Sequence, residues 1–265
     1  MTLGFCSFSS GSSGNSYLVC SRENAIIIDA GISAKKIVNG LQECKIEKEM
    51  VKALLITHEH IDHVKSIRAV TKKFEDMSVY ASKGTFRKLE NETYQDRCNV
   101  FVVGDKFHIG DIEVTSFKIS HDAAEPCGYS FRKDEEKISI VTDTGCMTEE
   151  IHHAIKDSGI LVLEANHDPE ILKMGDYPWS LKQRILGDRG HLSNDCAGKA
   201  ILHFLRSSER KVPMFFLAHL SRKNNFPEIA FETVKAVVEE GDYYLDKDFV
   251  LRMLLKDDFS GLHWL

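Results

Sequence analysis

Thr57-His58-Glu59-His60-Ile61-Asp62-His63 is the stretch that decides the fold, because it places three imidazoles and a carboxylate among six positions directly after the apolar run 51–56. A chain that leaves a strand extended puts His58 and His60 on one side, and the start of a helix turns Asp62 and His63 toward a second point. The two points would lie about 3.5 to 4 Å apart, as paired metal ions do. A solvated polar loop is the alternative, but such a cluster at a strand end usually carries chemistry. The stretch therefore predicts a metal site.

Further candidate ligands follow later apolar runs. His121 comes after 114–119, Asp143 after 138–141 and His219 after 214–217. A single histidine near a strand end is more often structural than a ligand, yet these three in this order complete a set of seven ligands. Mixed imidazole and carboxylate ligation suits divalent ions. We therefore expect two divalent metal ions, zinc or manganese first, with iron as an alternative.

These residues resemble the metallo-β-lactamase superfamily, in which a strand-end HxHxDH is followed by a histidine, a metal-bridging aspartate and a last histidine. The resemblance spans nearly the whole chain. It implies an α/β (α+β) fold, the four-layer αββα sandwich, as a single domain over residues 1–265. It also implies a first metal held by His58, His60 and His121, a second held by Asp62, His63 and His219, and Asp143 as the bridge.

Four motifs, at 8–16, 164–168, 190–194 and 218–221, look like the YycJ/WalJ subgroup, which is related to the RNase Z and RNase J nucleases. This resemblance implies hydrolysis of phosphodiester bonds in DNA or RNA, with exonuclease action of 5′-to-3′ polarity as the family assignment. The β-CASP insert of the RNase J branch has no room between the motifs. In the implied mechanism, Asp62 orients the hydroxide that attacks the phosphate.

His191 lies between Gly190 and Leu192. Similarity to the RNase Z group implies that it binds the phosphate or protonates the leaving oxygen, so we treat it as catalytic with Asp62. A histidine that merely decorates the surface is the alternative.

Two segments are candidates for substrate binding. The Gly/Ser-rich loop 9–16 could be a flexible linker, but its glycines would let backbone N–H groups turn inward to form an anion site, with Ser12 and Asn15 beside it. Segment 168–189 mixes basic and aromatic side chains, which suits phosphates and stacked bases. Lys182 and Arg184 are its candidate phosphate contacts, and a solvated helix face is the alternative.

Composition narrows the class of protein. With 43% hydrophobic and 28% charged residues the chain can bury a large core, and no apolar run approaches the roughly 18 residues of a membrane span. The first residues show no secretory signal, so we expect cytoplasmic localisation and no membrane partner. Seven cysteines without a CxxC pair argue against a disulfide framework and a thiolate zinc site. The net charge of −6 restricts phosphate binding to local patches. The oligomeric state is left open.

Strand-like and helical runs alternate along the chain. Two sheets with outer helices fit this order better than a doubly wound single sheet, because the opening half is rich in hairpin-length connections. The expected strands are 3–8, 17–20, 25–28, 51–56, 79–81, 100–103, 106–109, 112–119, 128–132, 137–141, 160–163 and 213–217. The expected helices are 34–43, 62–74, 149–156, 181–186, 194–205 and 227–239.

The function that these observations predict is dinuclear metal-assisted hydrolysis of nucleic acid. A small-molecule hydrolase acting on a cyclic phosphodiester or a thioester could use the same seven ligands. The non-enzymatic alternative is a protein whose metals serve only to hold a regulatory surface.

Overall fold

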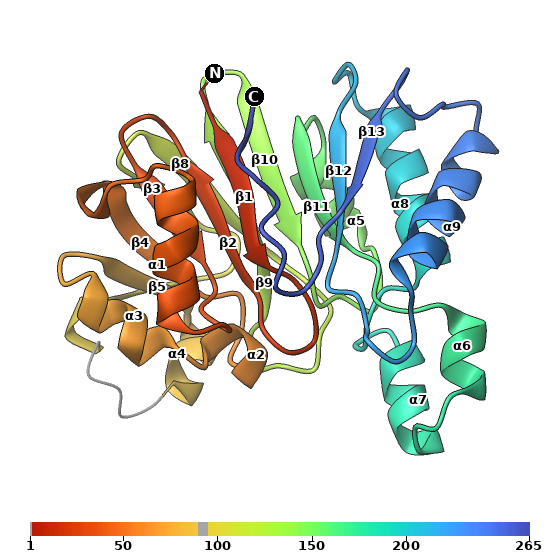
Figure 1. The fold of residues 1–265 in the computed structure, drawn as a ribbon, viewed down its shortest axis with the longest axis horizontal. Helices are drawn as coiled ribbons and strands as arrows, with labels where there is room; N and C mark the ends of the chain where they lie inside the picture. Colours follow the sequence, from red (N-terminus) through yellow and green to blue (C-terminus); the bar gives the residue numbers. More distant parts are fainter. Residues whose placement is uncertain (1, 90–94) are drawn as a thin grey trace.

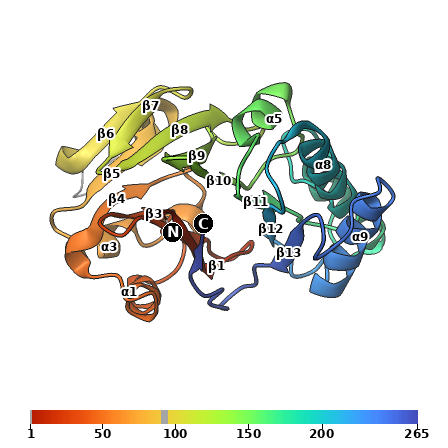
Figure 2. The same cartoon turned by 90° about the horizontal axis from the view of Figure 1, so that it is seen from above.

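The computed structural model describes residues 2–89 and 95–265 and shows two mixed sheets packed face to face, with helices on both outer sides (Figures 1 and 2). This four-layer arrangement confirms the predicted αββα sandwich. The two chain ends lie close together, because the last residues return along β1 (Figure 1).

The first sheet has the strand order β14-β1-β2-β3-β4-β5-β6. Its pairs are antiparallel from β14 to β3 and parallel from β3 to β6. Its strands are β1 (Gly4–Ser9), β2 (Ser16–Cys20), β3 (Ala25–Ile28), β4 (Val51–Leu55), β5 (Ser78–Ser82), β6 (Cys98–Phe101) and β14 (His263–Trp264).

The second sheet has the order β13-β12-β11-β10-β9-β8-β7. It is antiparallel from β7 to β10 and parallel from β10 to β13. Its strands are β7 (Lys106–Ile109), β8 (Ile112–Lys118), β9 (Cys127–Lys133), β10 (Glu136–Val141), β11 (Ile160–Glu164), β12 (Met214–Ala218) and β13 (Val250–Met253).

Several helices begin after a residue whose side chain accepts hydrogen bonds from the free N–H groups of the first turn. Ser33, Thr148 and Ser193 do this for α1, α5 and α8. The helices are α1 (Ala34–Glu43), α2 (Ile61–Val64), α3 (Ile67–Lys73), α4 (Lys83–Lys88), α5 (Glu149–Ile155), α6 (Pro169–Met174), α7 (Trp179–Leu186), α8 (Asn194–Ser207) and α9 (Pro227–Glu239). Within the described ranges, no helix combines the length and the apolar character needed to cross a membrane.

The strands bury both of their faces, so consecutive side chains enter different core layers. In β2, Tyr17 and Val19 point between the sheets, whereas Leu18 and Cys20 face the layer of α1 and α3. In β11, Ile160 and Val162 point between the sheets, and Leu161 and Leu163 face α5, α8 and α9. The central layer therefore joins the two sheets, and the outer layers attach the helices.

Some sequence expectations need correction. The single helix expected over 62–74 is two short helices, α2 and α3, because the chain turns at Lys65 and Ser66 between them. The strand expected over 100–103 begins earlier, at Cys98. Helices α4 and α6, of six residues each, and strand β14, of two, were not expected because they are shorter than the periodic runs that reveal an element in sequence. Strand β13 was not expected either.

Three strands end in residues whose backbone lies in the left-handed region, which is uncommon for residues other than glycine. Asp29 follows β3 with φ 60°, Asp143 follows β10 with φ 60°, and His219 follows β12 with φ 57°. Such conformations persist where the surrounding structure imposes them, and they gather at functional sites. All three residues lie at the edge of the sandwich where the parallel strands end.

Three loops, which follow β1, β3 and β4, are in contact at Gly31 near this edge. Its N–H donates to the Asn15 carbonyl at 2.9 Å, and the Asn15 N–H donates to the Asp62 carbonyl at 2.8 Å. A Cβ atom on Gly31 would lie 1.6 Å from that Asp62 oxygen. Only glycine allows the loops after β1, β3 and β4 to approach this closely.

Substitution of Gly31 by alanine should therefore push Asp62 away and lower the free energy of unfolding by about 2 to 4 kcal/mol. Urea unfolding followed by circular dichroism measures the change. Gly187→Ala is the matched control, because the nearest atom to its added Cβ would be 3.3 Å away. Equal midpoints for the two variants would show that the loops separate without cost.

Candidate metal centre

Three imidazoles from two loops form one cluster at the strand ends. His58 and His60 follow β4, and His121 follows β8 of the opposite sheet. The Nδ1 atom of His60 lies 3.2 Å from the Nε2 atom of His121. The ligand atoms of all three lie within 4.8 Å of one another, which is close enough to share one ion.

A second cluster lies beside the first. The Nε2 atoms of His63 and His219 each lie 3.6 Å from Oδ2 of Asp62. Asp143 stands between the clusters: its Oδ2 is 3.3 Å from His63 Nε2, and its Oδ1 is 3.9 Å from His121 Nε2. The structure thus brings together all seven residues that the sequence indicated as ligands, with Asp143 in the central position.

Asp29 orients the imidazoles that come from the first sheet. It is fully buried, and its Oδ2 lies 2.7 Å from Nδ1 of His63. Its carboxylate also accepts from the N–H and the hydroxyl of Thr57, and that hydroxyl lies 3.0 Å from Nδ1 of His58. These contacts leave the Nε2 atoms of His58 and His63 for the centre of the site.

Glu164 performs the same task in the second sheet. It is fully buried at the end of β11, and its Oε1 lies 2.8 Å from Nδ1 of both His191 and His219. Its Oε2 accepts from the N–H groups of Thr144 at 2.9 Å and Leu192 at 3.2 Å. One carboxylate therefore sets the orientation of a candidate ligand and of the candidate catalytic histidine.

Asp29 and Glu164 were both missed as site residues in the sequence. Each directly continues an apolar strand, Asp29 after 25–28 and Glu164 after 160–163. That is the same signal that identified His121, Asp143 and His219. Carboxylates that orient metal-ligating histidines are a general feature of such sites, so the signal was available.

The buried atoms of the clusters fit a divalent metal. Among the described residues, the Nε2 atoms of His58 and His219 are buried without a hydrogen-bond partner. An unpaired buried nitrogen is costly unless a group outside the protein chain satisfies it. Imidazole nitrogens and carboxylate oxygens together are the donors that divalent transition metals prefer. The residues present therefore fit metal binding at this edge.

The electrostatics favour positive charge at the centre. Burial lowers the pKa of His58, and the imidazoles of His63 and His121 lower it further. Burial would also lower the pKa of His63, but the carboxylates of Asp143 and Asp29 raise it to about 9. Glu164 shows the converse, since burial would raise its pKa but His191 and His219 hold it below the usual range. The carboxylates thus favour protonation of the neighbouring imidazoles when no metal is bound. A metal cation would take the place of these protons.

Of the candidate substrate-binding residues, some line a cavity and others are buried. Ser12, Arg184 and His191 line one cavity of about 150 Å³ next to the imidazoles, together with Tyr177 and Asp122. The guanidinium of Arg184 pairs with Asp122 at the mouth.

The predictions for Lys182 and Asn15 require correction. Lys182 is only 8% exposed, and its ammonium donates to the carbonyl of Lys173 at 2.6 Å, so it braces α7 against α6. Asn15 is fully buried: its Oδ1 accepts from the Gly11 N–H, and its Nδ2 lies 3.1 Å from His63 Nε2. Neither side chain is free for substrate, because tertiary contacts that the sequence does not reveal use its polar atoms.

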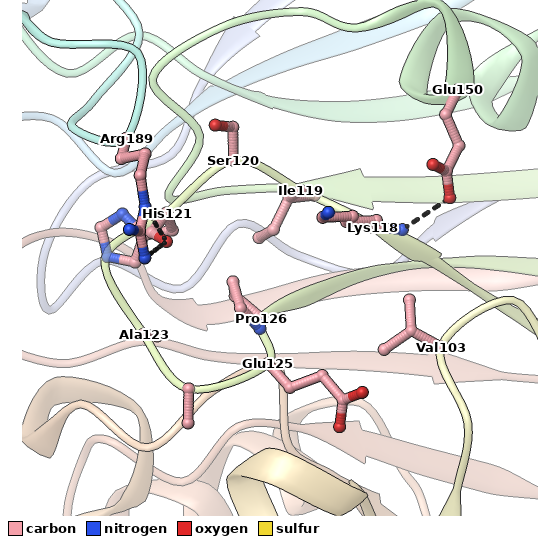
Figure 3. Close-up of a pocket in the computed structure, with 11 residues that line it drawn as sticks. Val103, Lys118, Ile119, Ser120, His121, Ala123, Glu125, Pro126, Glu150 and Arg189 are labelled. Carbon is pink, nitrogen blue, oxygen red and sulfur yellow. Dashed lines mark hydrogen bonds between the residues drawn. The ribbon is translucent and has the colours of Figure 1, made fainter.

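A second cavity, of about 630 Å³, is lined in part by the loop that carries His121 (Figure 3). Arg189 reaches across this loop and donates to the carbonyl of His121 at 3.3 and 3.2 Å (Figure 3). Lys118, Glu125 and Glu150 supply the other charges around the cavity. The loop between β8 and β9 thus contributes to both cavities, with Asp122 in the lining of the first and His121 in the lining of the second.

Replacing Asp143 by alanine tests the central position. Because Asp143 contacts residues of both clusters, the variant should lose metal from both, and the content after zinc or manganese loading should fall from about two ions per chain toward none. Elemental analysis of the desalted protein measures the content, with the exposed Asp76→Ala as control. Loss of one ion alone would assign Asp143 to a single site.

Comparisons with known proteins agree with this geometry. The family model of the beta-lactamase superfamily domain matches residues 24–215. The chain is 38% identical over 252 residues to the exodeoxyribonuclease YycJ of Bacillus anthracis, covering 94% of each protein. It is 38% identical over 245 residues to the exodeoxyribonuclease WalJ of Streptococcus pneumoniae serotype 2 (strain D39), covering 91% of this chain and 90% of that protein.

A solved structure confirms the fold independently. The metallo-beta-lactamase fold protein YhfI from Bacillus subtilis superposes with a TM-score of 0.73 at 13% identity and covers 98% of this chain and 99% of its own. At that identity the likeness concerns the fold alone. The family match and the relatives at 38% identity decide the membership: this chain belongs to the metallo-β-lactamase superfamily and, within it, to the family of the YycJ and WalJ proteins.

Proposed function

We propose that this protein is a metal-dependent exodeoxyribonuclease that hydrolyses phosphodiester bonds of DNA with two divalent metal ions. The observation that carries the proposal is the placement of Asp143 between two clusters of ligands, with His191 and Arg184 at the adjoining cavity. The relatives at 38% identity are named exodeoxyribonucleases, which favours DNA over RNA. Zinc and manganese both suit the donor set.

The metals would supply a nucleophile from water near neutral pH and neutralise charge on the phosphate. The first cluster, His58, His60 and His121, would hold one ion, and Asp62, His63 and His219 the other. Asp62 also has a positioning task. Its Oδ2 accepts from Nδ2 of Asn15 at 3.5 Å, and Asp62 would orient the attacking hydroxide when the metals are bound.

His191 would act on the leaving oxygen. Its Nδ1 is held by Glu164, so its Nε2 is the nitrogen available to the cavity that it lines. Burial would lower the pKa of His191, but the charge of Glu164 and the hydrogen bond to it raise the pKa, which favours the proton-donating form. A proton given to the leaving oxygen would assist departure of the cleaved strand.

A small-molecule hydrolase remains the alternative enzyme, because the metal clusters alone do not select a polymer. Arg184 and Tyr177 at the cavity favour the polymer, since a cation and an aromatic ring recognise a phosphate and a base. A purely regulatory role for the metals would leave the Glu164–His191 pair without a task.

Substitution of His191 by alanine should leave metal content unchanged and lower turnover by roughly 10²- to 10⁴-fold, the range of a positioned acid or base. Elemental analysis and steady-state kinetics on DNA measure the two effects. His153→Ala, on the exposed face of α5, is the control. If metal is lost in step with activity, His191 is a ligand instead.

Linear DNA with labelled ends tests the whole proposal. The metal-loaded protein should release mononucleotides from linear strands, leave covalently closed circles intact, and cleave bis(p-nitrophenyl) phosphate much more slowly, because a small ester makes no contacts beyond the metals. Nicking of closed circles would show that the protein acts as an endonuclease rather than an exonuclease. Faster hydrolysis of a cyclic phosphodiester or a thioester than of DNA would favour the small-molecule alternative.

A further inference from the structure

Each candidate ligand histidine has one ring nitrogen that faces the cluster and an outer ring nitrogen that faces away from it, and His60 differs from the others in the partner of this outer nitrogen. His58, His63, His121 and His219 each place Nδ1 within 3.1 Å of an oxygen, namely Thr57 Oγ1, Asp29 Oδ2, Gly190 O and Glu164 Oε1. His60 turns its Nδ1 toward the cluster, so its outer nitrogen is Nε2. Among the described residues, this Nε2 has no hydrogen-bond partner.

Asp122 is the acidic side chain beside that nitrogen. Its Oδ1 lies 3.9 Å from His60 Nε2 and 3.5 Å from His121 Nε2, and this oxygen is buried without a hydrogen-bond partner in the described part of the chain. Its Oδ2 accepts from Nε of Arg184. The carboxylate therefore stands between a candidate metal ligand and the arginine at the mouth of the cavity, with one oxygen committed and the other free.

The loop that carries Asp122 is held on both sides. The Ala124 N–H donates to Oε1 of Glu59 at 2.8 Å, and Glu59 lies between His58 and His60. On the other side, Arg189 donates twice to the carbonyl of His121 (Figure 3). The separation of 3.9 Å is about 1 Å longer than a hydrogen bond between a charged oxygen and a nitrogen, so a small rotation of either side chain closes it.

We infer that Asp122 is a positioning residue with two tasks: Oδ1 accepts from Nε2–H of His60 when Nδ1 of His60 binds the first metal, and Oδ2 holds Arg184 toward the DNA phosphate. A histidine that ligates through one nitrogen carries its proton on the other, and an acceptor there fixes the ring and strengthens the bond to the metal. Asp122 completes this arrangement for the fifth histidine. It also links metal binding to DNA binding, an extension that rests on the proposed nuclease function.

The substitutions Asp122→Ala and Asp122→Asn separate the two tasks. The alanine variant has no acceptor, and it should bind zinc at the first site roughly 10- to 100-fold more weakly. The asparagine variant keeps an amide oxygen for His60 but turns N–H groups toward Arg184, so its zinc affinity should stay near that of the wild type. Arg184→Gln should leave zinc affinity unchanged. Asp176→Ala, at an exposed position, is the control.

Zinc affinity is measured on the metal-free protein by competition with a chelating dye, which requires no nuclease activity. A wild-type zinc affinity in the alanine variant would overturn the inference for His60. Equal weakening in the alanine and asparagine variants would also overturn it, since the negative charge rather than the hydrogen bond would then be needed. Thermal unfolding checks that each variant is folded.

The second task is read from kinetics on DNA. Asp122→Asn and Arg184→Gln should each raise KM for DNA several-fold with little change in kcat, and the double variant should resemble either single variant, because both changes release the same guanidinium. Arg206→Gln, at an exposed position of α8, is the matched control and should leave KM for DNA unchanged. Additive effects in the double variant would overturn the link between the two residues. If no DNA is cleaved at all, the proposed nuclease function fails, and the zinc measurements still decide the role of Asp122 toward His60.

Discussion

The buried carboxylate of Glu164 must be satisfied by hydrogen bonds, and much of the site follows from how this is done. A lone ionised carboxylate in an apolar interior is strongly unfavourable. Glu164 meets the requirement with two imidazoles and two backbone N–H groups. Those four donors come from the segments after β10 and β12 and from the loop before α8. The need to satisfy one side chain therefore brings three segments of the second sheet to the same point.

Asp29 is the counterpart in the first sheet, where it joins the ends of β3 and β4 through Thr57 and His63. The apolar layer between the sheets holds together the strands that carry these two carboxylates behind the candidate metal centre. Asp143 and His219 adopt left-handed backbone conformations there, which the packed strands and hydrogen bonds around them impose. Strand ends thus position the candidate ligands, and the two carboxylates behind them set the direction of the His63, His191 and His219 rings.

The candidate substrate-binding residue Arg184 comes from a part of the chain outside the two sheets. Helices α6 and α7 project from the edge of the second sheet, below the sandwich in Figure 1. Arg184 comes from this projection, and Asp122 connects it to the metal centre. Lys182 lies on the same helix but uses its charge to hold α6 and α7 together. Two basic residues separated by one position in sequence therefore serve different purposes, because successive helical positions face different neighbours.

The sequence by itself determined the class of fold and the candidate ligands, since both are recorded in local patterns. Apolar runs that are followed by histidine or aspartate mark strand ends. The motif at 57–63 carries four of the ligand candidates within six consecutive positions. Tertiary structure alone decided which polar atoms stay free. Asn15 and Lys182 are occupied by partners elsewhere in the chain, and Asp29, Asp122 and Glu164 acquire their roles from residues 27 to 62 positions away. Hydrogen-bond partners at such separations depend on how the sheets pack, and no local pattern in the chain encodes them.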